Sequence, residues 1–132
     1  MSSEIPADLV YTEAHEWVRT TEDGIVRIGV TDHAQQQLGD VVFVQLPDVG
    51  DTFSAGDSMG EVESTKSVSD IYVPIGGEIV AVNEKLDDTP ELVNSSPYAD
   101  GWIVELRLAD GAEGQLESLL GPEAYQQLTE AS

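Results

Sequence analysis

The chain carries the stretch Glu61-Val62-Glu63-Ser64-Thr65-Lys66-Ser67-Val68-Ser69-Asp70 between two apolar strand signals. Val62 ends the first signal, and residues 71–73, an Ile-Tyr-Val run, begin the second. A short polar segment between two such runs favours an antiparallel hairpin, here with residues 64–68 as the connection. The pattern therefore predicts that Lys66 lies at the centre of an exposed turn.

Small hydroxyl side chains on both sides of Lys66 leave its ammonium group sterically open, and nearby carboxylates favour its charged form. An amine that projects from a rigid turn suits acylation by a foreign enzyme, because the strands hold the base of an attached arm still. An ordinary solvated lysine at a loop tip is the simpler interpretation. Lys85, in Asn83-Glu84-Lys85-Leu86-Asp87, has nearly the same local profile. The residues alone therefore do not choose between the two lysines.

Short strands separated by turns dominate the rest of the chain. Apolar and polar residues alternate over residues 26–30 and 102–108, which is typical of strands with one buried face. Residues 41–46 and 79–82 are more continuously apolar, as in strands with both faces covered. Gly and Pro recur between these segments, so we expect a β-sandwich or barrel. Four aromatic residues are expected in or near its core: Trp17, Phe43, Tyr72 and Trp102.

Helices are expected to be few and short. Thr31 stands in the N-cap position before residues 32–38, and Gly39 follows their end, which predicts one short helix. A helical pattern over residues 116–120 is interrupted by Gly121-Pro122. Pro122 then suits the first turn of a final helix. Its inward side chains are predicted to be Ala124, Tyr125 and Leu128.

Length and charge limit the class of protein. The chain has 132 residues, of which 40% are hydrophobic, which is enough for one compact domain and too few for two. It contains 26 Asp and Glu against 5 Lys and Arg, a formal net charge of −21. Phosphate binding needs clustered basic residues, so we expect no nucleic-acid partner and no membrane partner. The acidic surface either steers the protein toward basic patches on partners or only prevents self-association.

Several chemistries have no residues to support them. The absence of cysteine excludes a disulfide framework, a thiolate metal site and a cysteine nucleophile. His15 and His33 are far apart in the sequence and lack a ligand spacing, so we expect structural roles and no metal site. Neither a phosphate-binding loop nor a Gly-x-Ser-x-Gly elbow occurs, and we expect no catalytic residues. The start lacks the features of a signal peptide and no apolar run matches a membrane span, which favours a bacterial cytoplasmic location.

A set of sequence blocks in a fixed order covers about residues 9 to 128. The blocks are Tyr11-Thr12-x-x-His15-Glu16-Trp17-Val18, Gly29-Val30-Thr31-Asp32-His33-Ala34-Gln35, Leu38-Gly39-Asp40-Val41-Val42-Phe43-Val44-x-Leu46-Pro47, Val62-Glu63-Ser64-x-Lys66, Ser69-Asp70-Ile71-Tyr72-x-Pro74, Gly77-Glu78-Ile79-Val80-x-Val82-Asn83 and Pro90-Glu91-Leu92-Val93-Asn94-Ser95-x-Pro97-Tyr98-x-x-Gly101-Trp102. Together they closely resemble the H-protein of the glycine cleavage system, a lipoyl carrier protein. The match is specific to this family rather than to lipoyl domains in general.

The resemblance implies the function of particular residues. It places the family's lipoylated lysine on Lys66, with lipoate as a covalent cofactor in amide linkage, and it places Lys85 elsewhere in the fold. Glu16 is assigned to a cleft that shelters the loaded arm. Gln37 stands where some relatives carry histidine, which puts the role of that position in doubt. Thr65 and Ser67 replace the commoner Val and Ala beside the lysine, a change that leaves the assignment intact.

The resemblance also implies a place in a multienzyme system. A monomeric, non-catalytic carrier would take an aminomethyl group from the glycine decarboxylase (P-protein) to the aminomethyltransferase (T-protein). Dihydrolipoamide dehydrogenase (L-protein) would reoxidise the arm, and lipoyl-attaching enzymes would install it. The competing hypotheses are a relative that passes its acyl group to other carriers, an acidic β-rich adaptor with an unmodified lysine, and an enzyme acting alone. A biotin carrier is disfavoured because no Met flanks Lys66.

The implied fold is mainly β, a flattened barrel-sandwich hybrid of the lipoyl-domain type with short peripheral helices. We expect a single lipoyl-carrier domain over residues 1–132. Its lipoyl-like core would cover roughly residues 25–108, and its C-terminal helical segment roughly residues 113–130.

Overall fold

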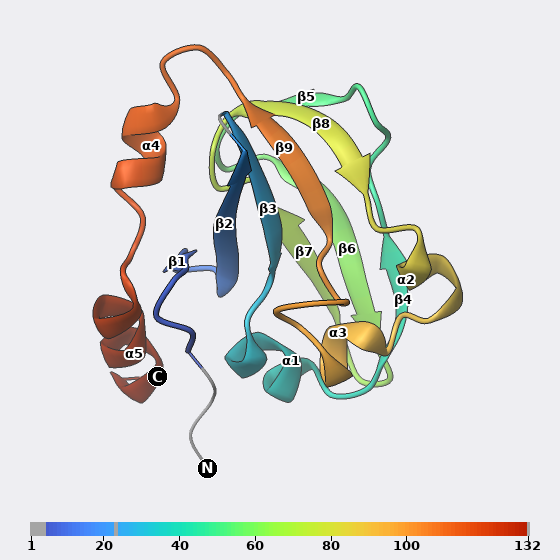
Figure 1. The fold of residues 1–132 in the computed structure, drawn as a ribbon. Helices are drawn as coiled ribbons and strands as arrows, with labels where there is room; N and C mark the ends of the chain where they lie inside the picture. The colour runs from blue at the N-terminus through green and yellow to red at the C-terminus, as the bar shows by residue number, and fades with distance from the viewer. Residues whose placement is uncertain (1–4, 23, 132) are drawn as a thin grey trace.

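The computed structural model describes residues 5–22 and 24–131 and arranges their strands in two antiparallel sheets (Figure 1). The larger sheet has the order β1 (Val10–Tyr11), β2 (Glu16–Glu22), β3 (Ile25–Val30), β9 (Val104–Leu108), β8 (Gly77–Val82) and β5 (Thr52–Phe53). The smaller sheet has the order β4 (Val41–Gln45), β6 (Ser58–Ser64) and β7 (Val68–Tyr72). The helices are α1 (Asp32–Leu38), α2 (Lys85–Asp88), α3 (Leu92–Ser95), α4 (Glu113–Glu117) and α5 (Pro122–Ala131). The expected mainly β class with short helices is confirmed.

One hydrophobic core unites the two sheets. The larger sheet contributes the fully buried side chains of Val26, Ile28 and Leu106 to this core. The smaller sheet contributes Val44 of β4 and Val62 of β6, each of which is 1% exposed. Successive residues of a strand point to opposite faces, so the apolar residues of an alternating pattern all face the core. The predicted alternation is confirmed for residues 26–30 and 104–108. It fails at the start of the second range, because β9 begins at Val104, Ile103 is fully buried and Trp102 is half-buried.

A second cluster forms between the larger sheet and the C-terminal helix. Tyr11, Trp17 and Tyr125 are fully buried there, and the rings of Tyr11 and Tyr125 stack with centroids 4.6 Å apart. The Trp17 ring lies against Gly29, where an added Cβ would come within 2.6 Å of it. The Trp17 indole N–H donates to the carbonyl oxygen of Pro97 at 2.9 Å. The core position predicted for Trp17 is confirmed.

Three burial predictions are wrong: those for residues 42–43, for Tyr72 and for Ala124. The pairing of β4 with β6 shifts register between Val41 and Phe43, and this irregularity leaves both Val42 (51% exposed) and Phe43 (49% exposed) outside the core. Tyr72 is also exposed, because it follows the buried Ile71 on a strand with one covered face. In α5 the inward face carries Tyr125 and the half-buried Leu128, whereas Ala124 is exposed.

The predicted ends of α1 and the predicted start of α5 are confirmed. The helical pattern over residues 116–120 is wrong beyond Glu117, where α4 ends, because Leu120 pairs with Tyr11 in an isolated β-bridge. The hydroxyl oxygen of Thr31 accepts a hydrogen bond from the backbone N–H of Ala34, which caps α1. Gly39 follows with a φ of 80°, a backbone conformation that favours glycine. Helix α5 begins at Pro122, after the break that separates it from α4. None of the helices in the described ranges is long and apolar enough to cross a membrane.

Candidate functional site

The tip of the β6–β7 hairpin presents Lys66. The strands extend further than the sequence pattern predicted, so the connection is residues 65–67 instead of residues 64–68. Ser64 organises this turn: its backbone N–H donates to the Ser67 carbonyl oxygen at 2.8 Å, and its hydroxyl oxygen accepts from the N–H groups of Lys66 (3.3 Å) and Ser67 (3.1 Å). Ser64 itself is only 7% exposed. These hydrogen bonds fix the backbone of the turn, while the Lys66 side chain stays exposed.

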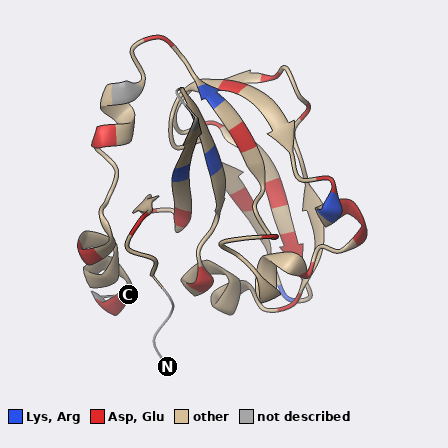
Figure 2. Ribbon diagram, viewed as in Figure 1, with Lys and Arg blue, Asp and Glu red and all other residues tan. Residues whose placement is uncertain are grey.

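The amine of Lys66 has no carboxylate partner in the part of the chain that the structure describes. Arg27 pairs with Glu105 at 2.9 Å, and Arg107 lies 3.7 Å from Glu78. Both pairs lie in the larger sheet, so neither involves a residue of the hairpin tip. Figure 2 shows acidic residues spread over strands, helices and loops, with few basic residues among them. An unpaired, exposed amine on a fixed turn is open to acylation.

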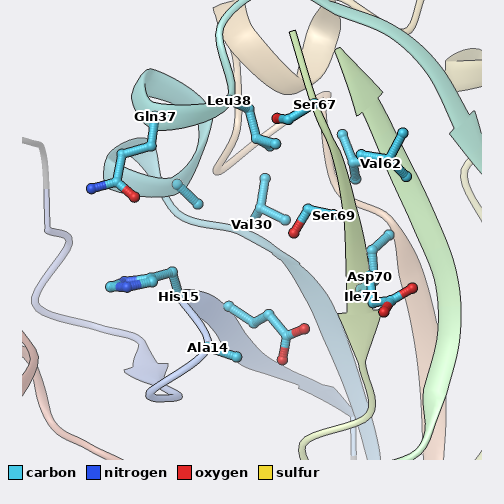
Figure 3. A pocket seen from close by; sticks show the side chains of 13 residues that line it. Ala14, His15, Val30, Gln37, Leu38, Val62, Ser67, Ser69, Asp70 and Ile71 are labelled. Carbon is cyan, nitrogen blue, oxygen red and sulfur yellow. The ribbon is translucent and has the colours of Figure 1, made fainter.

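A cleft of about 330 Å³ opens beside this turn. Figure 3 shows Ser67, Ser69 and Asp70 on one side of it, and Gln37 and Leu38 of α1 on another. Because residue 67 follows Lys66 directly, a group attached to Lys66 starts at the edge of this cleft. The volume falls in the range of pockets that hold small organic ligands.

Glu16, which the resemblance assigned to a cleft, lines this one. Its side chain is only 2% exposed. One carboxylate oxygen accepts a hydrogen bond of 2.7 Å from the backbone N–H of Tyr72 on β7, and the other accepts from the hydroxyl of Thr12 at 3.4 Å. Burial raises the pKa of Glu16 to about 8, although both hydrogen bonds favour the charged form. The cleft wall thus holds a carboxyl group that is mostly protonated near neutral pH.

The two histidines meet in space despite their separation in sequence. The His15 and His33 rings lie with centroids 4.8 Å apart, because the backbone N–H of Thr31 donates to the His15 carbonyl oxygen and joins the two segments. His15 also shares a hydrogen bond of 2.8 Å with the Tyr125 hydroxyl. Burial, with a smaller contribution from the charge of His33, lowers the pKa of His15. Across the described residues, no three His, Cys, Asp or Glu side chains gather in a group that could hold a metal ion.

Lys85 occupies a different setting from Lys66. It is the first residue of α2, and its backbone N–H donates to the Asn83 side-chain oxygen at 3.3 Å. The sequence could not separate the two lysines, because they have nearly the same local profile. The structure places only one of the two on a hairpin beside the cleft that Glu16 lines. The sequence predicts the helix stop at Gly39 but gives no signal that the turn at residues 39–40 contacts the hairpin tip.

Comparison with known proteins decides the family. The family model described as "Glycine cleavage H-protein" matches residues 9–132. The chain belongs to the glycine cleavage H-protein family. The glycine cleavage system H protein of Mycolicibacterium vanbaalenii is 60% identical over 124 residues, which cover 93% of this chain and 95% of the relative. That of Chromohalobacter salexigens is 56% identical over 129 residues, covering 98% of this chain and 97% of the relative.

A solved structure in the same family supports the fold. The crystal structure of a glycine cleavage system H protein from Mycobacterium marinum superimposes with a TM-score of 0.86 and is 44% identical in sequence. The match covers 96% of this chain and 99% of that one. This H-protein fold therefore agrees with the barrel-sandwich hybrid predicted from the resemblance, with its two sheets left open at their edges.

Proposed function

We propose that the chain is the lipoyl carrier of a glycine cleavage system and that lipoate is attached to the amine of Lys66 through an amide bond. The observation that carries the proposal is the position of Lys66: an exposed, unpaired amine on a fixed turn at the edge of a cleft. Family membership supports the choice of lipoate, since H-proteins carry this group in the glycine cleavage system. We further propose that residues 1–132 act as a single carrier domain.

The protein's own contribution is position and shelter. When attached, the lipoyl group supplies the sulfur atoms that carry an aminomethyl group and that are reoxidised afterwards. Ser64 holds the base of the arm through its hydrogen bonds to Lys66 and Ser67 within the turn. The cleft is large enough for the distal part of the arm and lowers its contact with water. Glu16 supplies a buried carboxyl group to the cleft wall, which is the role we propose for it.

The proposed partners are the P-protein, the T-protein, the L-protein and the lipoyl-attaching enzymes. The decarboxylase would load the arm, the aminomethyltransferase would receive the one-carbon unit, and the dehydrogenase would take the electrons. The formal net charge of −21 supports encounters with basic surfaces on these enzymes. The chain would thus be a non-catalytic component, and its monomeric state and cytoplasmic location stay predictions.

Reconstitution with a purified glycine decarboxylase tests this function. The lipoylated chain should support exchange of labelled bicarbonate into the carboxyl group of glycine, whereas the unmodified chain should not. A lipoylated chain that fails to support exchange would contradict the carrier role. Transfer of the lipoyl group from this chain to a second carrier protein, in the absence of such exchange, would favour the relay hypothesis instead.

A further inference from the structure

The hairpin tip rests on the turn between α1 and β4, which consists of Gly39 and Asp40 and is called the shelf below. The backbone N–H of Thr65 donates to the carbonyl oxygen of Asp40 at 3.1 Å. The Lys66 side chain lies over Gly39, where its Cε would be 3.3 Å from an added Cβ. The absence of a side chain on Gly39 therefore leaves room for the methylene stem of Lys66.

Asn94 of α3 holds the shelf in place through hydrogen bonds of its side-chain amide. Its amide nitrogen donates to the Gly39 carbonyl oxygen at 2.8 Å, and its amide oxygen accepts from the Val41 N–H at 2.8 Å. The same amide nitrogen also donates to the side-chain oxygen of Gln35 on α1 at 3.0 Å. The half-buried side chain of Asn94 thus binds the residues directly before and directly after Asp40. It connects α3 to α1, to the shelf and to the start of β4.

We propose that Asn94 is a positioning residue for the acylation of Lys66. The contacts form a continuous series: Asn94 fixes the shelf, Asp40 of the shelf binds Thr65, and the shelf supports the stem of Lys66. The shelf directly follows Leu38, which lines the cleft, so the same contacts also set where an attached arm enters it. The identity of the acyl group as lipoyl rests on the proposed function; the positioning of the hairpin tip does not.

Asn83 offers a matched control for this role. It is a buried asparagine whose amide nitrogen donates to the carbonyl oxygens of Asp100 (2.7 Å) and Trp102 (2.8 Å). Its amide oxygen accepts from the N–H of Lys85. Asn83→Ala removes a similar set of side-chain-to-backbone bonds without touching the shelf. A comparison of Asn94→Ala with Asn83→Ala therefore separates loss of stability from loss of position.

Two measurements on the full chain test the proposal. The first is kcat/KM for lipoylation of Lys66 by a purified lipoate–protein ligase, and the second is the hydrogen-exchange rate of the Thr65 amide. Asn94→Ala should lower kcat/KM roughly ten- to hundredfold, as expected when a reacting group is misplaced. It should also speed exchange at Thr65. Asn83→Ala should leave both values near those of the wild type.

The outcomes are distinguishable. Wild-type values for Asn94→Ala, or equal losses in Asn94→Ala and Asn83→Ala, would overturn the positioning role. Asn94→Asp, which keeps an acceptor for Val41 but loses the donor to Gly39, replaces Asn94→Ala if that variant fails to fold, and it should show a smaller loss of the same kind. If the wild-type chain accepts no lipoyl group, the proposed function fails, and exchange at Thr65 alone decides whether Asn94 positions the tip.

Discussion

A carboxylate oxygen of Glu16 lies 2.7 Å from the backbone nitrogen of Tyr72, so a buried acid on β2 is bonded directly to β7 of the other sheet. The bond joins the two sheets at the cleft. It also keeps the carboxyl group in a position with little access to water. The protonation state of this group therefore affects both the stability of the fold and the character of the cleft wall.

The first prediction concerns Glu16 and pH. Burial raises the pKa of this residue from 4.5 to about 8. Between these values the folded protein holds a proton that the unfolded chain releases, so ionisation of Glu16 lowers the free energy of unfolding as the pH rises. Glu16→Gln keeps an acceptor for Tyr72 and removes the titration. The stability of the wild type relative to Glu16→Gln should therefore fall from about pH 5 to about pH 8 and level off above.

Urea unfolding of both proteins at a series of pH values measures this difference. The subtraction cancels the titration of other groups, including His15. The pKa of His15 is lowered, so its titration reduces stability as the pH falls below its ordinary value of 6.5. A difference between wild type and Glu16→Gln that does not change with pH would contradict the account of Glu16.

The second prediction concerns Gly39. Gly39→Ala places a Cβ 3.3 Å from the Lys66 Cε, on a backbone with a φ of 80°. The strain should cost roughly 1–3 kcal/mol of unfolding free energy, which urea unfolding measures. Gly111→Ala is the control, because Gly111 has a φ of 82° but nothing within 4 Å of an added Cβ. Only Gly39→Ala should also slow lipoylation; equal lipoylation rates in both variants would show that the contact with Lys66 is unimportant.

The third prediction concerns the attachment of the C-terminal helix. The Tyr125 hydroxyl is bonded to the Thr31 hydroxyl at 2.7 Å and to His15 at 2.8 Å, and the residue is fully buried. Tyr125→Phe should lower the free energy of unfolding by about 1–2 kcal/mol, because it leaves buried partners unsatisfied. Tyr72→Phe removes an exposed hydroxyl that is 3.4 Å from Asp70 and should cost about 0.5 kcal/mol or less. Similar losses in the two variants would argue against the Tyr125 contacts.

Local signals explain why much of the fold could be predicted from the sequence. The Thr31 cap, the Gly39 stop and the alternation of β3 and β9 depend on neighbours a few residues away. The exposure of Val42 and Phe43 depends on how β4 pairs with β6, which an apolar run does not reveal.

The candidate site was less accessible to sequence reasoning than the fold. Spacing alone left Lys66 and Lys85 equivalent, and only the family resemblance selected between them. The contacts of the shelf with Thr65 and Asn94 join segments far apart in the chain, so no local pattern contains them. The same is true of His15 and His33, whose rings lie together in space although the two residues are far apart in the sequence.

The central claim is that Lys66 is the lipoyl attachment residue, and mass spectrometry of lipoylated chains tests it most directly. The wild type, Lys66→Arg and Lys85→Arg are each incubated with lipoate, ATP and a lipoate–protein ligase, and the intact masses are then measured. The account predicts a gain of one lipoyl group in the wild type and in Lys85→Arg, and no gain in Lys66→Arg. A lipoyl group on Lys66→Arg, or an unmodified wild-type chain under conditions that lipoylate a known H-protein, would contradict it.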